Sequence, residues 1–378
     1  KMKKVLILLL SMVMVCSLLT GCGSSTTKET EGTATGNTDN TNAKEPTKAA
    51  TENIGELTIG FSTGASGTAF RTILENDFKT VADEYKAAGR LKDYKIVNNV
   101  TNWDASEQAN IIRDFINDSD IDVIMVNPNS PTDLNGVLAE AVAAGKQVVV
   151  LDCEVDVDGV LCVSIDHYNW SKKAAEWICN ELGSGTAIQI YGGDGHPANN
   201  DRINGTYDTL KDYPDIDLIA DTTGGWDNQV AKEATTQILG SGVNVDAVFT
   251  QDSMAAGVLS AFMDLNKVPK VMFGELGTQF IKEVVELKEK GTEIKFCTQP
   301  NPPGIAASAL RLAVNVSEGK EFKDGVIGGH FGNGYYYPVN AWYTQDNLDE
   351  LQTMIADKAD DWLYSEYLTE DQALKLFK

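Results

Sequence analysis

Residues 121–151, IDVIMVNPNSPTDLNGVLAEAVAAGKQVVVL, decide the fold of this chain. The runs at 121–126 and 147–151 are short, apolar and rich in β-branched residues, whereas the apolar residues near 131–144 recur at helical spacing. A strand, a helix and a second strand in this order form the βαβ unit from which parallel sheets are built. The stretch therefore predicts an α/β fold.

The same unit recurs on both sides of this stretch. Upstream, strands are expected at 57–61 and 94–98, with helices near 69–88 and 104–118. Downstream the pattern restarts, with strands expected at 187–191, 216–222, 247–251, 271–273 and 293–298, each followed by a helix. A folded body of about 320 residues is more than one ordinary core accommodates. The sequence therefore predicts two similar Rossmann-like lobes, each with a parallel sheet.

The beginning of the chain combines Lys1, Lys3 and Lys4 with an apolar stretch at 5–19 and the sequence Leu19-Thr20-Gly21-Cys22. The apolar run is too short for a membrane span, and its surroundings are those of a secretory signal. It resembles the start of a bacterial lipoprotein precursor. This resemblance implies that residues 1–21 are a signal peptide and that the Cys22 thiol is lipidated. The alternative is an ordinary signal peptide that contains a cysteine.

Residues 22–53 are expected to form a disordered, lipid-anchored tether. Positions 23–53 contain no Val, Ile, Leu or aromatic residue, so this segment cannot bury enough apolar surface to fold. A flexible coil of this length spans roughly 30 Å, enough to hold a folded body off a membrane. The folded part is expected to start near Ile54.

The composition excludes several classes of partner. The chain carries 31 basic and 55 acidic side chains, and removal of the three signal lysines leaves 28 and 55, a net charge of −27. So acidic a protein is not expected to bind nucleic acid.

The body cysteines form no CxxC pair and the three histidines are scattered, so no metal or other cofactor is expected. Cys153 and Cys162 could pair, but buried free thiols are favoured.

Polar and aromatic residues follow the expected strands at one edge of each sheet. In an open parallel sheet, ligands bind beyond the carboxyl ends of the strands, so these residues are candidates for a site. They are Phe70, Arg71, Asp152, Trp226, Gln251, Asp252, Glu275 and Gln299. Carboxylates and amides accept and donate hydrogen bonds to adjacent hydroxyls, guanidinium supplies a fork of donors, and aromatic faces cover the C–H side of a sugar ring. The set favours a neutral sugar over a phosphate or a dinucleotide.

At these residues the chain resembles the type I periplasmic binding proteins of the ribose, galactose and galactofuranose class, the solute receptors of ABC importers. The resemblance extends from Ile54 to about Gly329. It rests on Phe70-Arg71, on the strand end at 148–152, on Asp201-Arg202-Ile203-Asn204-Gly205, on Val248-Phe249-Thr250-Gln251-Asp252, on Gly274-Glu275-Leu276-Gly277 and on Thr298-Gln299-Pro300.

The resemblance implies two lobes that clamp a monosaccharide, a pentose or hexose in pyranose or furanose form, and deliver it to a permease with its ATPase. The first lobe would supply Phe70, Arg71 and Asp152. The second lobe and the hinge would supply Trp226, Gln251, Asp252, Glu275 and Gln299, with Asn200 where the family often has an arginine. Crossover segments are expected near 165–166, 299–300 and 323–329.

By the same resemblance the lobes would comprise 54–165 with 300–325 and 166–299 with 326–345. Residues 346–378 go beyond the usual family body and read as a helical extension, with helices at 346–356, 357–367 and 369–377. We expect this extension to pack on the lobes. Partner recognition, or the lining of a cleft enlarged for a disaccharide, remains open.

Several candidate site residues could instead have a purely structural role. Phe70 and Trp226 could belong to a lobe core, and Arg71 could cap a helix. Asp152 and Glu275 could be helix N-caps. Arg202 is expected to make a structural ion pair. Trp103 and His196 could lie on the surface or in the site.

A different function is suggested by Gly60-Phe61-Ser62-Thr63-Gly64, which matches the G-x-S-x-G pattern of serine hydrolases. A secreted esterase that uses Ser62 would also need an acid and a histidine after other strand ends, and no histidine stands in such a place. The protein is therefore expected not to be an enzyme. Receptors for an oligosaccharide, a nucleoside or a furanosyl signalling molecule are further alternatives.

The expected setting follows from the signal and the fold. We expect an extracytoplasmic monomer, lipid-anchored to the outer face of the cell membrane of a Gram-positive bacterium. Its partners would be a sugar and an ABC permease with its ATPase.

Overall fold

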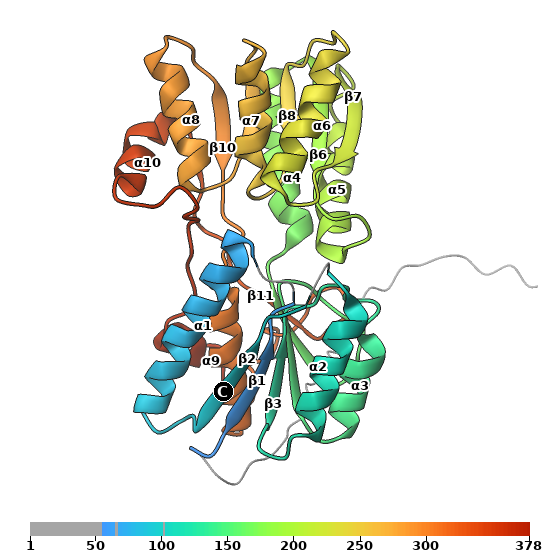
Figure 1. Cartoon of the computed structure of the whole chain (residues 1–378), viewed down its shortest axis with the longest axis vertical. Coiled ribbons are helices and arrows are strands. Elements are labelled where there is room, and N and C mark those ends of the chain that lie inside the picture. The colour runs from blue at the N-terminus through green and yellow to red at the C-terminus, as the bar shows by residue number, and fades with distance from the viewer. Residues whose placement is uncertain (1–54, 65–66, 101–102) are drawn as a thin grey trace, which may run out of the picture. The chain divides into compact units, whose positions relative to one another are not determined.

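The computed structural model describes residues 55–64, 67–100 and 103–378 (Figure 1). The expected signal, the tether and Cys22 lie outside the described residues. The described chain forms two six-stranded sheets. We call each sheet with its helices a lobe.

The first lobe has the strand order β11-β5-β4-β3-β1-β2, and its paired strands are parallel. The strands are β1 (Thr58–Ser62), β2 (Asp93–Val97), β3 (Val123–Val126), β4 (Gln147–Leu151), β5 (Val160–Ser164) and β11 (Gly334–Tyr336). Figure 1 shows helices α2 (Ala105–Asn117) and α3 (Asn135–Ala143) on one face, and α1 (Ala69–Ala87) and α9 (Ile305–Ser317) on the other. Because helices cover both faces, β3 and β4 are buried throughout, as their continuous apolar runs predict.

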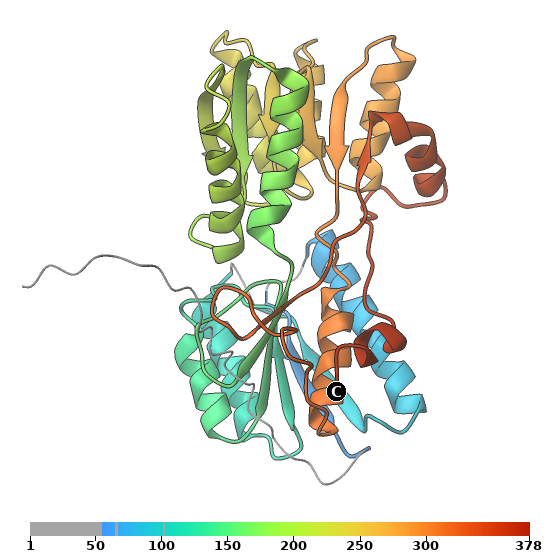
Figure 2. The same ribbon diagram turned by 180° about the vertical axis from the view of Figure 1, so that it is seen from behind.

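The second lobe has the strand order β12-β10-β9-β8-β6-β7. Its strands are β6 (Gly185–Tyr191), β7 (Ile216–Thr223), β8 (Ala247–Phe249), β9 (Val271–Gly274), β10 (Lys295–Thr298) and β12 (Tyr343–Thr344), of which β12 is antiparallel to β10. Figure 2 shows α4 (His167–Leu182) and α5 (Pro197–Leu210) on one face of this sheet. The other helices are α6 (Asn228–Gly240), α7 (Met254–Asp264), α8 (Thr278–Glu289) and α10 (Leu348–Ile355).

The predicted α/β fold with two lobes of mainly parallel strands is confirmed. Most ends of the predicted strands differ from the observed ends by one or two residues. Strands β11 and β12 were not predicted, and neither was β5. It follows β4 after only eight residues without an intervening helix, so it departs from the alternation on which the other strands were recognised.

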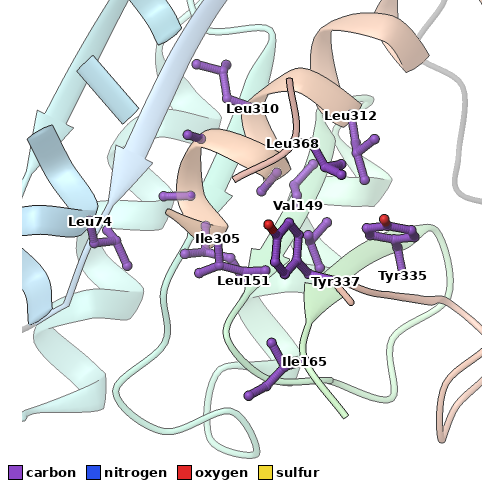
Figure 3. Close-up of a cluster of buried hydrophobic side chains, with 14 of the residues drawn as sticks. Leu74, Val149, Leu151, Ile165, Ile305, Leu310, Leu312, Tyr335, Tyr337 and Leu368 are labelled. Atoms are coloured by element: carbon purple, nitrogen blue, oxygen red, sulfur yellow. The ribbon is translucent and has the colours of Figure 1, made fainter. Parts of the chain in front are cut away.

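The C-terminal extension departs from its prediction in the middle. The helices expected at 346–356 and 369–377 occur as α10 and the shorter α11 (Glu370–Leu374). The prediction of a helix at 357–367 was wrong, because Leu363 in this segment pairs with Gly277 in an antiparallel bridge. The last residues pack on the first lobe, where Leu368 lies among side chains of the buried cluster that includes Ile305 and Leu310 of α9 (Figure 3).

Within the described residues, the chain passes between the lobes at four places. The first two, between β5 and α4 and between β10 and α9, lie where the sequence predicts crossovers. The third links β11 to β12 and is later than the expected 323–329, because β11 joins the first sheet beside β5. The fourth, which was not predicted, leads from the pairing at Leu363 to α11, which packs on α9.

The four cysteines of the described chain are free and buried, so Cys153 and Cys162 are not paired. Among residues 55–64, 67–100 and 103–378, no helix has both the length and the apolar character that a membrane span requires.

Candidate ligand-binding site

A cavity lies between the two lobes, at the carboxyl ends of both sheets. It has a volume of ≈150 Å³. Its walls come from the first lobe (Thr68, Phe70, Arg71, Trp103 and Asp152), from the second lobe (His196, Ala198, Arg202, Gly225, Trp226, Asp227, Asp252, Ser253 and Glu275) and from Asn301 in the crossover after β10. The cavity is therefore a place where one small ligand would touch both lobes.

Arg71 is held in the first-lobe wall by backbone carbonyls. Thr68 caps α1 by accepting a hydrogen bond from the Arg71 amide, which places Arg71 in the first turn. The Arg71 Nη1 donates to the Thr63 carbonyl over 2.5 Å, and its guanidinium lies 5.4 Å from the centre of the Trp103 ring. Burial lowers the pKa of Arg71 to about 10, so the side chain remains charged at neutral pH.

Asp152 follows β4 in the left-handed backbone region, with φ of 68°. This conformation is uncommon for a residue other than glycine. The Asp152 Oδ1 accepts a hydrogen bond from the Asn301 Nδ2 over 3.2 Å. Burial raises the pKa of Asp152 to about 6, although Arg202 and Arg71 act in the opposite direction.

His167 links the first-lobe wall to Arg202. Its Nε2 lies 3.1 Å from the Asp152 carbonyl oxygen, and its Nδ1 accepts a hydrogen bond from the Arg202 Nε over 3.2 Å. A neutral imidazole with its proton on Nε2 satisfies both contacts. Burial lowers the pKa of His167 well below its usual value, which agrees with the neutral form.

Trp226 forms the aromatic wall of the second lobe. The Trp226 Nε1 donates to the Gln251 Oε1 over 3.1 Å, and the Gln251 Nε2 donates to the Asn199 Oδ1 over 2.9 Å. His196 meets the Trp226 ring edge to face, with the ring centres 5.1 Å apart. The ring lies so close to Gly192 that a Cβ there would be 2.1 Å from its Cε2. Glycine at 192 is therefore required for this position of the indole.

Arg202 and Asp252 form an ion pair beside the indole. The Arg202 Nη1 lies 2.5 Å from the Asp252 Oδ2, and Arg202 is only 1% exposed. The guanidinium also lies 4.5 Å from the centre of the Trp170 ring. Glu275 lies nearby, where burial and then the charge of Asp252 raise its pKa well above the usual value. The wall thus combines a fixed cation, a carboxylate and a carboxyl group that favours its protonated form.

The structure brings together six of the nine residues predicted for ligand binding. Phe70, Arg71, Asp152, Trp226, Asp252 and Glu275 line the cavity. Gln251 and Gln299 do not line it. Both are buried, and the Gln299 Nε2 donates to the Trp170 carbonyl over 2.6 Å. Asn200 is exposed and lies outside the cavity wall, whereas its neighbour Asn199 is buried and supports Gln251.

Other residues of the wall were missed or left open. Trp103 and His196, which could equally have lain on the surface, both line the cavity. Arg202 makes the expected ion pair but also faces the cavity. Asn301 was missed entirely. The sequence could have indicated Asn301, because this residue comes only three positions after the end of β10, at the same edge of the sheet as the other candidates.

Ser62 has an environment unlike that of an activated nucleophile. The residue is fully buried, and its hydroxyl accepts a hydrogen bond from the Gln108 Nε2 over 3.1 Å. It does not line the cavity. Within the described part of the chain, no cluster of His, Cys, Asp and Glu side chains is arranged to hold a metal ion.

Two α/β lobes with a polar and aromatic cavity between them define the architecture of a type I periplasmic binding protein. The chain belongs to the periplasmic binding protein domain family, which matches residues 59–321. The predicted family resemblance is therefore confirmed.

Known relatives agree with this assignment. The D-allose-binding periplasmic protein of Escherichia coli is 28% identical over 251 residues, which cover 64% of this chain and 79% of that protein. An ABC transporter solute-binding protein from Thermobispora bispora has a similar structure, with a TM-score of 0.72 and 24% identity over 84% of this chain and 94% of its own. A solute-binding protein from Bacillus halodurans with bound myo-inositol has a TM-score of 0.65 and 20% identity, over 80% of this chain and 99% of its own.

Proposed function

We propose that this protein is the extracytoplasmic sugar receptor of an ABC importer. It captures a monosaccharide, a pentose or hexose, in the cavity between its lobes and delivers it to the permease. The observation that carries this proposal is the composition of the cavity wall, where Arg71 and Asp152 of the first lobe and the indole of Trp226 of the second lobe line the same cavity.

The chemistry of the wall suits a neutral polyol. The Arg71 guanidinium can donate to ring and hydroxyl oxygens, and the ionised Asp152 can accept from two neighbouring hydroxyls. An indole face covers the C–H side of a sugar ring. A micromolar receptor needs a net binding free energy of about −8 kcal/mol, which a few such hydrogen bonds and one or two aromatic faces can supply. The names of the relatives, which include allose-binding and galactofuranose-binding proteins, point to the same class of ligand.

The proposed mechanism is binding followed by closure. A ligand that touches both lobes binds a closed form more tightly than an open one, so it shifts the population toward closure. The permease would recognise the closed form. No bond chemistry is involved, and the burial of Ser62 beside Gln108 supports a binding protein over an esterase.

The remaining parts of the proposal concern the setting. The protein would be a monomer tethered through a lipid on Cys22, with residues 22–53 as the spacer. Closure would move the two sheets with their helices, so the lobe division predicted from the sequence, 54–165 with 300–325 and 166–299 with 326–345, changes in its last part, because β11 belongs to the first sheet. Of the family residues, Asn200, Gln251 and Gln299 would contact the ligand only after a rearrangement, since none of them lines the cavity.

A thermal-shift screen tests the proposal. The chain without residues 1–21 is heated with pentoses, hexoses, short oligosaccharides, nucleosides and esters. A ligand at 100 times its dissociation constant adds about 2.7 kcal/mol to the stability of the folded state, enough to raise the midpoint by several degrees. A shift with one sugar that Asp152→Ala or Trp226→Ala removes supports the proposal. No shift with any sugar, together with ester turnover that Ser62→Ala abolishes, would replace it with the esterase.

A further inference from the structure

A second cavity adjoins the first. It has a volume of ≈230 Å³, compared with ≈150 Å³ for the first. The two share the wall formed by Thr68, Trp226, Asp227, Ser253 and Glu275. The outer wall of the second cavity is the segment from Asp360 to Leu363, which belongs to the C-terminal extension. A ligand that fills the first cavity therefore has a larger space immediately beside it.

Backbone pairing fixes the extension at this place. The Thr278 amide donates to the Trp362 carbonyl over 3.0 Å, and the Tyr364 amide donates to the Leu276 carbonyl over 2.8 Å. Between these bonds, Leu363 pairs with Gly277, where a Cβ would lie only 3.1 Å from the Trp362 carbonyl oxygen. The Lys282 Nζ holds Asp360 over 2.6 Å. The outer wall is thus fixed by the fold.

One residue in the wall of the second cavity has a polar group with no protein partner. Thr278 lines it, is fully buried, and has a hydroxyl for which the described residues supply no hydrogen-bond partner. The Asn228 Oδ1 also has no partner among them, but it lies against Gly257 of α7, where a Cβ would be only 2.4 Å away. Buried polar atoms are rarely left without a partner, and a ligand hydroxyl would pair with the Thr278 hydroxyl once the cavity wall adjusts around the ligand.

The second cavity also has aromatic side chains in its wall. Trp226 contributes to both cavities, and Trp362 adds a second indole from the extension. Indole surfaces together with hydroxyl, amide and carboxylate groups are a combination that binds a sugar ring. An apolar substituent would leave the Thr278 hydroxyl without a partner.

We propose that the second cavity is a subsite for a second sugar ring, so that the receptor binds a disaccharide. The first ring occupies the cavity with Arg71 and Asp152, and the second ring lies between Trp226 and Trp362. This inference rests on the proposed function, because it requires a sugar ring in the first cavity, and it changes the cargo from a monosaccharide to a disaccharide. The C-terminal extension thereby acquires a role in ligand selection.

Titration calorimetry with the chain lacking residues 1–21 tests this subsite. The probes are free pentoses and hexoses, their methyl glycosides, and a panel of disaccharides built from them. We expect one disaccharide to bind about tenfold or more tightly than the methyl glycoside of its common ring. Trp362→Ala should remove this preference and leave the dissociation constant of the methyl glycoside within about twofold of the parent value.

A second pair of variants covers the case in which Trp362→Ala does not fold. Thr278→Val removes only the unpartnered hydroxyl, and it should reduce the preference for the disaccharide. Thr250→Val is the matched control, since its buried hydroxyl also has no partner among the described residues but does not line either cavity. It should keep the preference.

The outcomes separate this inference from the proposed function. If a monosaccharide binds and no disaccharide binds more tightly than the methyl glycoside, the subsite is refuted and the receptor stands. Equal weakening of both probes by Thr278→Val also refutes the subsite. If no sugar of any kind binds, both proposals fail.

Discussion

The Asn301 Nδ2 donates a hydrogen bond to the Asp152 Oδ1 over 3.2 Å and joins the crossover after β10 to the end of β4. Asp152 lines the cavity, and Asn301 lies in a segment that runs between the lobes. A ligand that bonds to Asp152 therefore acts on a side chain that is already tied to a crossover. In the proposed mechanism, this contact would link ligand binding to closure.

The first prediction concerns the pH dependence of sugar binding. Asp152 must be ionised to accept hydrogen bonds from ligand hydroxyls, and its pKa is raised to about 6 by burial. We expect affinity to fall about tenfold between pH 7 and pH 5, because the ionised fraction falls by that factor. Arg71, Arg202 and Asp252 are the other charged groups that influence it. Calorimetry at several pH values measures the effect.

The stability of the ligand-free protein should change in the opposite direction. Folding raises the pKa of the Asp152 carboxyl from 3.8 to about 6, so the protonated group stabilises the folded state. This stabilisation is fully present below the unfolded pKa of 3.8 and is lost as the pH rises through about 6. Asp152→Asn should therefore melt at a higher temperature than the parent at pH 7, yet bind sugar weakly and without the pH dependence. Asp324→Asn, at a side chain that is 99% exposed, is the control and should change neither property.

The second prediction tests the contact between Gly192 and Trp226. The Cβ of Gly192→Ala would lie 2.1 Å from the Trp226 Cε2, so the indole must move away from its place in the wall. We expect ligand affinity to fall about tenfold or more and stability to fall by about 1–3 kcal/mol. Thermal melts with and without ligand measure both effects.

Gly136→Ala provides the matched control for this substitution. Gly136 lies in α3, and a Cβ there meets no atom within 4 Å. The change should leave binding intact and raise stability by about 0.5–1 kcal/mol, because alanine favours a helix. Normal binding by Gly192→Ala would remove Trp226 from the proposed site.

The sequence predicts the fold well because the buried strands of a parallel sheet are continuous apolar runs. Strand β5 was not predicted, because no helix separates it from β4. The segment 357–367 was assigned to a helix from its local pattern, but tertiary pairing between Leu363 and Gly277 overrides that pattern. Local periodicity cannot register a partner that lies more than eighty positions away in the chain.

The sequence predicts which edge of the sheets carries the candidate site, but not which side chains face the cavity there. Six of the nine predicted residues line the cavity because the carboxyl ends of parallel strands meet there. Gln251 also follows its strand, yet its amide turns to Trp226 and Asn199. The order of residues indicates which strand end carries a group, but packing decides whether its side chain faces the cavity or supports another one.

The third prediction separates a buried ion pair from an exposed one. Arg202 is 1% exposed and bonds to Asp252 and His167. Arg202→Ala leaves the Asp252 carboxylate without its cation, so we expect a loss of about 3 kcal/mol in stability together with a loss of ligand binding. Chemical denaturation gives the free energy of unfolding.

Arg113→Ala is the corresponding surface substitution. Its Nε lies 2.9 Å from Glu140, and both side chains are about half exposed. A pair of this kind contributes less than about 1 kcal/mol, since water and salt screen it. Equal losses from the two variants would contradict the structural assignment of Arg202.

The last prediction concerns the anchor of the C-terminal extension on the first lobe. The Glu370 carboxylate lies 2.6 Å from Arg90 and 3.0 Å from Arg311, and it accepts a hydrogen bond from the Tyr85 hydroxyl. Glu370→Gln should lower stability at pH 7 by about 1–2 kcal/mol, because it replaces charged hydrogen bonds by neutral ones. Glu321→Gln, whose exposed side chain lies 3.5 Å from Lys378, should cost less than about 0.5 kcal/mol.

The pH dependence of this anchor gives a second check. Burial acts to raise the pKa of Glu370, but hydrogen bonds from Tyr85 and Arg90 outweigh it, so the pKa is lowered from 4.5. A lowered pKa means that the stabilisation is present above the unfolded value and is lost as the pH falls through the folded one. The difference between Glu370→Gln and the parent should therefore shrink below about pH 4.5 in denaturation experiments. A difference that stays constant down to pH 3 would mean that the charge of Glu370 does not hold the extension in place.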